Sequence, residues 1–159
     1  MFSIRLLNRQ RKKRINLQKL RKFAAQALSE LPVQRQPGKP PEQINIVFVS
    51  DARIAWLHRT YMSIDGPTDV ITFHHGDIFI SVETAAKQAK EFRTSFEYEL
   101  ELYIVHGLLH LCGFEDASDK GRREMQRLQE RLVAASRRSL HHALTLRSAA
   151  IRSETGGCE

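Results

Sequence analysis

The pattern of apolar and polar positions divides the chain into short strands and amphipathic helices. Residues 2–6 and 44–48 alternate between apolar and polar side chains, which predicts two half-buried strands. The apolar runs 70–73 and 78–82 are separated by the segment 74–77, which contains glycine and aspartate. This arrangement predicts two neighbouring strands joined by a tight connection.

Apolar residues that recur every three or four positions predict about five helices. The expected helices cover residues 17–31, 51–61, 83–92, 95–112 and about 118–133. Asn16 and Ser50 are suitable N-terminal caps, Pro32 ends the first helix, and Gly113 ends the fourth. Residues 34–42 are rich in proline and are expected to form a loop.

Four short strands and five helices in 159 residues predict a single α+β domain with a small sheet. A chain of this length buries roughly 70% of its unfolded surface, enough for a proper core. Helical periodicity fades after Arg138, so we expect the single domain to cover residues 1–138. Residues 139–159 are expected to be a partly disordered C-terminal tail.

The chain carries only two cysteines, Cys112 and Cys158, which excludes a disulfide-rich secreted scaffold. No stretch approaches the roughly 18 apolar residues of a membrane span. The basic N-terminus lacks the apolar run of a signal peptide. These features predict a cytoplasmic protein with no membrane contact and no disulfide-linked partner.

The net charge of +7 is unevenly distributed. Residues 1–39 carry a charge of +10, residues 40–119 a charge of −8, and residues 120–159 a charge of +5. Basic flanks around an acidic middle suit a polyanion held near a cation-binding centre. The alternative is that the run from Arg9 to Arg14 is only a solvated surface.

Two histidines carry the most specific chemistry in the chain. His106 and His110 are one helical turn apart, so both imidazoles project from the same helix face. Two neutral imidazoles at this spacing can bind one Zn²⁺, and a catalytic zinc needs a third protein ligand. Gly113 allows the chain to reverse, which could bring Glu115 or Asp116 back to the histidines. Alternatively, the pair is simply hydrogen-bonded within the core.

Gly107 argues against peptide hydrolysis. A protease of the His-Glu-x-x-His type carries its general base directly after the first histidine, and here that position is glycine. Cys112 points about 160° away from His110 around the helix, so it is expected in the core rather than at a metal.

Three motifs stand in order along the chain, at residues 61–73, 76–81 and 106–116. Together they resemble the YbeY family of metal-dependent, single-strand-specific endoribonucleases. Residues 106–116 read His-Gly-Leu-Leu-His-Leu-Cys-Gly-Phe-Glu-Asp, similar to the family's His-Gly-x-Leu-His-Leu-x-Gly-Tyr-Asp-His. Residues 61–73 resemble its Tyr-Arg-x-x-Asp-x-Pro-Thr-Asp-Val-Leu-Ser-Phe, and residues 76–81 its Gly-Asp-Ile-x-Ile-Ser. The resemblance spans roughly residues 44–132.

The resemblance implies one Zn²⁺ per chain, with His106, His110 and Asp116 as metal ligands. Asp116 stands where the family has a third histidine, and Glu115 is the alternative ligand or a catalytic base that positions water. Met62 stands where the family has an arginine. Arg59, three residues earlier, is expected either to replace that arginine in catalysis or to be an ordinary surface residue.

The function implied is cleavage of single-stranded RNA in ribosomal RNA maturation, including the 3′ end of 16S rRNA, and in ribosome quality control. The implied partners are ribosomal RNA and the small ribosomal subunit. Two alternatives stay open, because Met62 and Asp116 depart from the family pattern. One is a ribosome-associated RNA-binding factor with a catalytically silent metal, and the other is a zinc hydrolase of another substrate.

Overall fold

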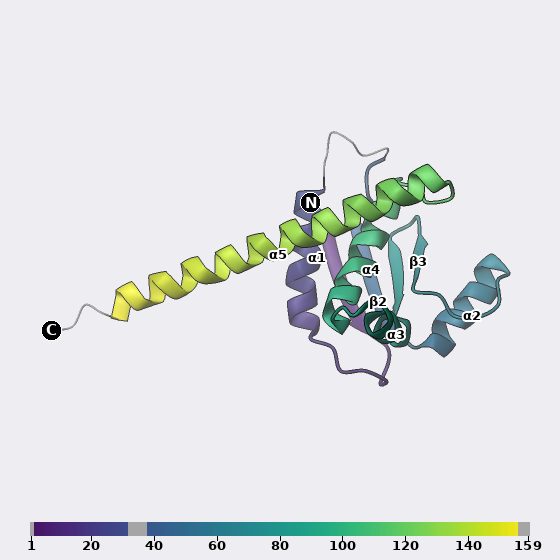
Figure 1. The fold of residues 1–159 in the computed structure, drawn as a ribbon, viewed down its shortest axis with the longest axis horizontal. Coiled ribbons are helices and arrows are strands. Elements are labelled where there is room, and N and C mark those ends of the chain that lie inside the picture. Colours follow the sequence, from purple (N-terminus) through teal and green to yellow (C-terminus); the bar gives the residue numbers. More distant parts are fainter. Residues whose placement is uncertain (1, 32–37, 156–159) are drawn as a thin grey trace.

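The fold is built on a four-stranded sheet, seen in the computed structural model, which describes residues 2–31 and 38–155 (Figure 1). Its strands are β1 (Ser3–Asn8), β2 (Gln43–Val49), β3 (Val70–Phe73) and β4 (Asp77–Ser81). Their order is β1-β2-β4-β3. β1 and β4 both pair with β2 in parallel, and β3 pairs with β4 as an antiparallel edge strand.

Five helices complete the described chain. They are α1 (Leu17–Glu30), α2 (Asp51–Met62), α3 (Val82–Phe92), α4 (Phe96–Leu111) and α5 (Asp119–Thr155). The first four begin at side-chain caps, where an Asn or Ser oxygen accepts from a backbone N–H three residues later. The predicted α+β class, with four strands and five helices in one domain, is confirmed.

Alternation along β2 gives each face of the sheet its own core. Ile46 and Phe48 lie in the larger core, together with buried residues of α1 and α4. Val47 and Val49 face the other way and pack with residues of α2. The N-terminal half of α5 adds Met125 to the larger core, so α4 is buried between the sheet and α5 (Figure 1).

Gly107 lets α4 lie very close to the sheet. A β-carbon built at this position would lie 2.6 Å from the Cγ2 atom of Ile78 on β4, and 2.9 Å from its Cδ1 atom. Real β-carbons essentially never make such short contacts. Helix–sheet packing therefore requires glycine at this position, where a His-Glu-x-x-His protease carries its general base.

The last helix is longer than the sequence pattern indicated. The fading periodicity after Arg138 predicted the end of regular structure, but α5 continues to Thr155 and extends beyond the body of the protein (Figure 1). Ser139 still donates a hydrogen bond to Glu30 on α1 at 2.6 Å, and side chains from 141 to 152 are exposed. The reason is that this stretch contains good helix formers and no Gly or Pro, so propensity sustains the helix without burial. The boundary of the domain at residue 138 stays a prediction.

Some expectations fall on residues outside those described. This group contains Pro32, residues 34–37 of the predicted loop, and Cys158 in the tail.

Cys112 is buried and has a free thiol. In the described chain, none of the helices combines the length and apolar character that crossing a bilayer requires.

Candidate metal centre

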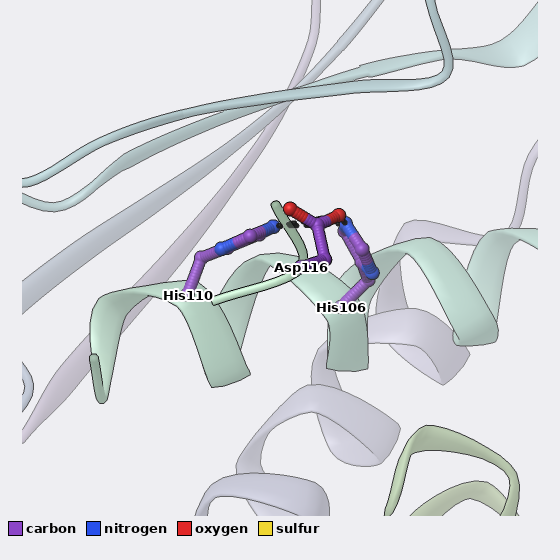
Figure 2. Close-up of side chains that lie close together, drawn as sticks. All are labelled: His106, His110 and Asp116. Carbon is purple, nitrogen blue, oxygen red and sulfur yellow. Dashed lines mark hydrogen bonds and ion pairs between the residues drawn. The ribbon is translucent and has the colours of Figure 1, made fainter. Parts of the chain in front are cut away.

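Three side chains from α4 and the reversal after it converge on one point (Figure 2). The Nε2 atoms of His106 and His110 lie 3.0 Å apart. The Oδ2 atom of Asp116 lies 3.7 Å from His106 Nε2 and 3.6 Å from His110 Nε2. Gly113, with a φ angle of +87°, ends the helix and turns the chain back toward the two imidazoles. The structure thus brings together the three residues that the sequence suggested.

Hydrogen bonds to the far side of each imidazole determine where the ring protons lie. His110 Nδ1 lies 3.0 Å from the carbonyl oxygen of Phe114, and His106 Nδ1 lies 3.0 Å from Oε1 of Gln129. Both oxygens can only accept, so each Nδ1 donates its proton and each neutral ring keeps a lone pair on Nε2. Burial, together with the adjacent His106, holds the pKa of His110 below its usual value, which favours this neutral form.

The converging donor set fits a metal ion. Two Nε2 lone pairs and a carboxylate oxygen face one another, and no proton lies between them in this tautomer. A tetrahedral zinc with bonds of about 2.0–2.1 Å separates its ligand atoms by about 3.3 Å. The three observed separations, 3.0, 3.6 and 3.7 Å, bracket this value, and the centre of their triangle lies about 2.0 Å from each atom. The ligand atoms are partly buried, as an accessible catalytic ion requires.

The remaining predicted site residues lie apart from this group. Glu115 is exposed on the reversal and is not one of the three converging side chains. Arg59 lies on α2, where its Nε donates to Oδ1 of Asp65 at 2.9 Å, and its side chain is 74% exposed. Met62 is also exposed at the end of α2. Catalytic roles for Glu115 and Arg59 stay predictions.

Gln129 is a site residue that sequence reasoning missed. It lies on α5 and holds His106 through the Nδ1 contact at 3.0 Å. Its spacing carried a signal, because it is four residues from both Met125 and Val133, which are buried. A polar residue on the buried face of a helix needs a hydrogen-bond partner, and here that partner is His106, a candidate metal ligand.

A cavity of about 520 Å³ opens beside the converging side chains. His106 and Asp116 line it, and its other walls come from α3, α4, α5 and the residue preceding β3. The centre therefore faces a space large enough for a small organic group.

The α+β fold carries one candidate metal centre, formed by convergent donor atoms on a buried helix and the reversal after it. Residues 5–137 match the family model described as "Endoribonuclease YbeY". Because this match covers most of the sequence, the chain belongs to the endoribonuclease YbeY family, and the predicted resemblance is confirmed.

Individual relatives support the same assignment. The chain is 38% identical over 104 residues to the endoribonuclease YbeY of Parabacteroides distasonis, a match covering 61% of this chain and 73% of the relative. It is 39% identical over 103 residues to that of Bacteroides fragilis, covering 60% and 73%. The solution structure of TM1509 from Thermotoga maritima superposes with a TM-score of 0.61 at 28% identity, covering 89% of this chain and 93% of that one.

Proposed function

We propose that this endoribonuclease cleaves single-stranded RNA with one Zn²⁺ bound by His106, His110 and Asp116. The observation that supports this proposal is the convergence of two imidazole Nε2 atoms and a carboxylate oxygen, with separations of 3.0 to 3.7 Å, beside an open cavity. Ribosomal RNA is the proposed substrate, including the 3′ end of 16S rRNA. The proposed location is the cytoplasm, with the small ribosomal subunit as partner.

The protein side of the chemistry follows from how the ligands are held. A bound Zn²⁺ supplies a Lewis acid, which polarises a phosphoryl oxygen and lowers the pKa of water toward about 7. Gln129 and the Phe114 carbonyl fix both imidazoles with Nε2 toward the ion. Asp116 adds a negative charge, so the ion is a weaker Lewis acid than it would be with three histidines. Glu115, one residue away, is the proposed carboxylate that accepts a proton from water.

The basic segment Arg9–Arg14 is the proposed electrostatic anchor for RNA. Its arginine and lysine side chains are exposed, and Gln10 orders the turn by accepting from the backbone N–H groups of Lys12 and Lys13. This segment follows the C-terminal end of β1. The C-terminus of α4 lies at the opposite end of the sheet, since Gly38, near the start of β2, donates to the carbonyl of Cys112 (Figure 1). An RNA strand that contacts both the basic segment and the metal centre therefore spans the length of the sheet.

The test compares wild type with His110→Ala on one unstructured RNA, using protein purified without a histidine tag. Wild type should contain about one zinc per chain and cleave the RNA, and a chelator should abolish cleavage. His110→Ala should lose metal and activity but keep its circular dichroism spectrum, since the core does not depend on the ion. Asp116→His should retain cleavage. If every sample shows the same background cleavage, the enzyme hypothesis is wrong, and the alternative of an RNA-binding factor with a catalytically silent metal takes its place.

A further inference from the structure

The cavity beside the metal centre has an unusual charge for a site that handles RNA. Four carboxylates line it: Asp69, Glu99, Asp116 and Glu130. Arg122 is the one cation among the described residues of its wall, and it is already paired with Asp119. A bound Zn²⁺ would offset two of these four negative charges and leave the wall opposite the ion acidic. Away from the metal position this acidic wall repels a phosphate group, whereas an uncharged group that donates hydrogen bonds is favoured there.

Tyr103 provides an unpaired hydroxyl in the same wall. The residue is 7% exposed, and its hydroxyl has no hydrogen-bond partner among the described residues. Burial, followed by the negative charges of Asp69 and Glu99, raises the pKa of Tyr103, so it remains a protonated donor. Leaving a buried hydroxyl unpaired is unfavourable, and such groups in native structures usually have a partner or a function.

Aromatic surface lines the same cavity. Phe92, at the end of α3, is 62% exposed and lines the cavity, so its ring is accessible to a ligand. Tyr98 also lines the wall, and the guanidinium of Arg137 lies 5.1 Å from its ring centroid. Exposed rings beside hydrogen-bonding groups are the usual components of a site for an unstacked base of single-stranded RNA.

We propose that this cavity is a nucleobase subsite that receives the base next to the cleaved phosphate and prefers adenine or cytosine to uracil. Adenine and cytosine present an amino donor beside a ring-nitrogen acceptor. The amino group suits the carboxylates of Asp69 and Glu99, and the ring nitrogen suits the hydroxyl of Tyr103. Uracil presents a carbonyl oxygen where adenine and cytosine have the amino donor, and an N–H where they have the ring-nitrogen acceptor, so both contacts are mismatched. The inference rests on the proposed function, because it assigns the RNA to the same centre.

The first test uses Tyr103→Phe, which removes only the unpaired hydroxyl. Single-stranded RNAs that differ in one nucleotide, A, C or U, flanked by the same sequence, serve as substrates. Wild type should cleave the A and C substrates with a kcat/KM roughly tenfold above that for U. Tyr103→Phe should lose most of this preference while its Tm stays equal or rises, because no existing hydrogen bond is broken. Tyr61→Phe, the same change at an exposed ring, is the matched control and should behave as wild type.

The second test measures binding without catalysis. Isothermal titration of metal-free protein with the same RNAs should show tighter binding of A and C than of U, and Phe92→Ala should weaken all three by roughly tenfold. Equal affinities for the three RNAs, unchanged by Tyr103→Phe and Phe92→Ala, would overturn the subsite even if cleavage is robust. If base selectivity in binding is present but no RNA is cleaved, the subsite stands and the proposed hydrolysis fails.

Discussion

The close packing at Gly107 makes Gly107→Ala the sharpest test of how α4, the helix that carries His106 and His110, is positioned. In an exposed helix, replacing glycine by alanine stabilises by about 0.5–1 kcal/mol, because glycine loses more backbone entropy on folding. Here the added methyl group would lie 2.6 Å from Ile78 Cγ2. Ile78 is fully buried on β4, a strand paired on both sides, so it has little room to move.

Overpacking of this kind costs about 1–3 kcal/mol. After subtraction of the helix-propensity gain, we expect Gly107→Ala to lower the free energy of unfolding by about 1–2 kcal/mol. For a domain of this size the Tm should fall by about 2–8 °C. Urea unfolding of metal-free protein, followed by circular dichroism, measures the change without any contribution from the ion.

A double-mutant cycle with Ile78→Ala shows whether the clash is the cause. Ile78→Ala alone should destabilise the protein by about 2–5 kcal/mol through the cavity it creates. In that background Gly107→Ala should be neutral or stabilising, because all three short contacts involve atoms of the deleted side chain. An equal effect in both backgrounds, or a Gly107→Ala protein as stable as wild type, would refute the packing argument.

Three further predictions concern the site, the RNA and the response to acid. Gln129→Leu should weaken zinc affinity by about 10–100-fold in competition with a chromophoric chelator, because His106 loses the acceptor that orients it; unchanged affinity would contradict this role. Replacing the four cations at positions 11–14 with alanine should flatten the dependence of log affinity on log salt by about 0.7 for each lost phosphate contact. Burial tends to raise the pKa of Asp51, but hydrogen bonds, led by the one from Lys87, hold it below its ordinary value. The ionised carboxylate therefore stabilises the fold near neutral pH, and this stability is lost as pH falls below about 4. As the pH is lowered through that range, the urea midpoint of Asp51→Asn should fall less steeply than that of wild type.

Local features were predictable from the sequence because they depend on near neighbours in the chain. The caps at Asn16 and Ser50, the strand alternation in β2 and the one-turn spacing of His106 and His110 all belong to this group. The reversal at Gly113 was also visible, since glycine readily adopts a positive φ.

Features that depend on distant pairing were not predictable from one sequence. The strand order β1-β2-β4-β3 leaves no local trace, because parallel pairing is decided by how the crossover helices pack. The contact between Gln129 and His106 joins residues 23 positions apart. The length of α5 was underestimated because periodicity reports burial, whereas an exposed helix can continue on propensity alone.

Because α5 both closes the core and holds His106, the proposed metal ligand, the retention of an ion at this site would be tied to the opening of the helix. Met125 and Val133 anchor α5 in the core, and Gln129 between them holds His106. An opening that lifts α5 from α4 releases the histidine from its orienting bond, while a bound ion opposes that opening by mass action. If the centre binds an ion as proposed, its lifetime follows the rate of this local opening, and slower amide hydrogen exchange in the buried part of α5, around Met125 to Val133, reports metal occupancy.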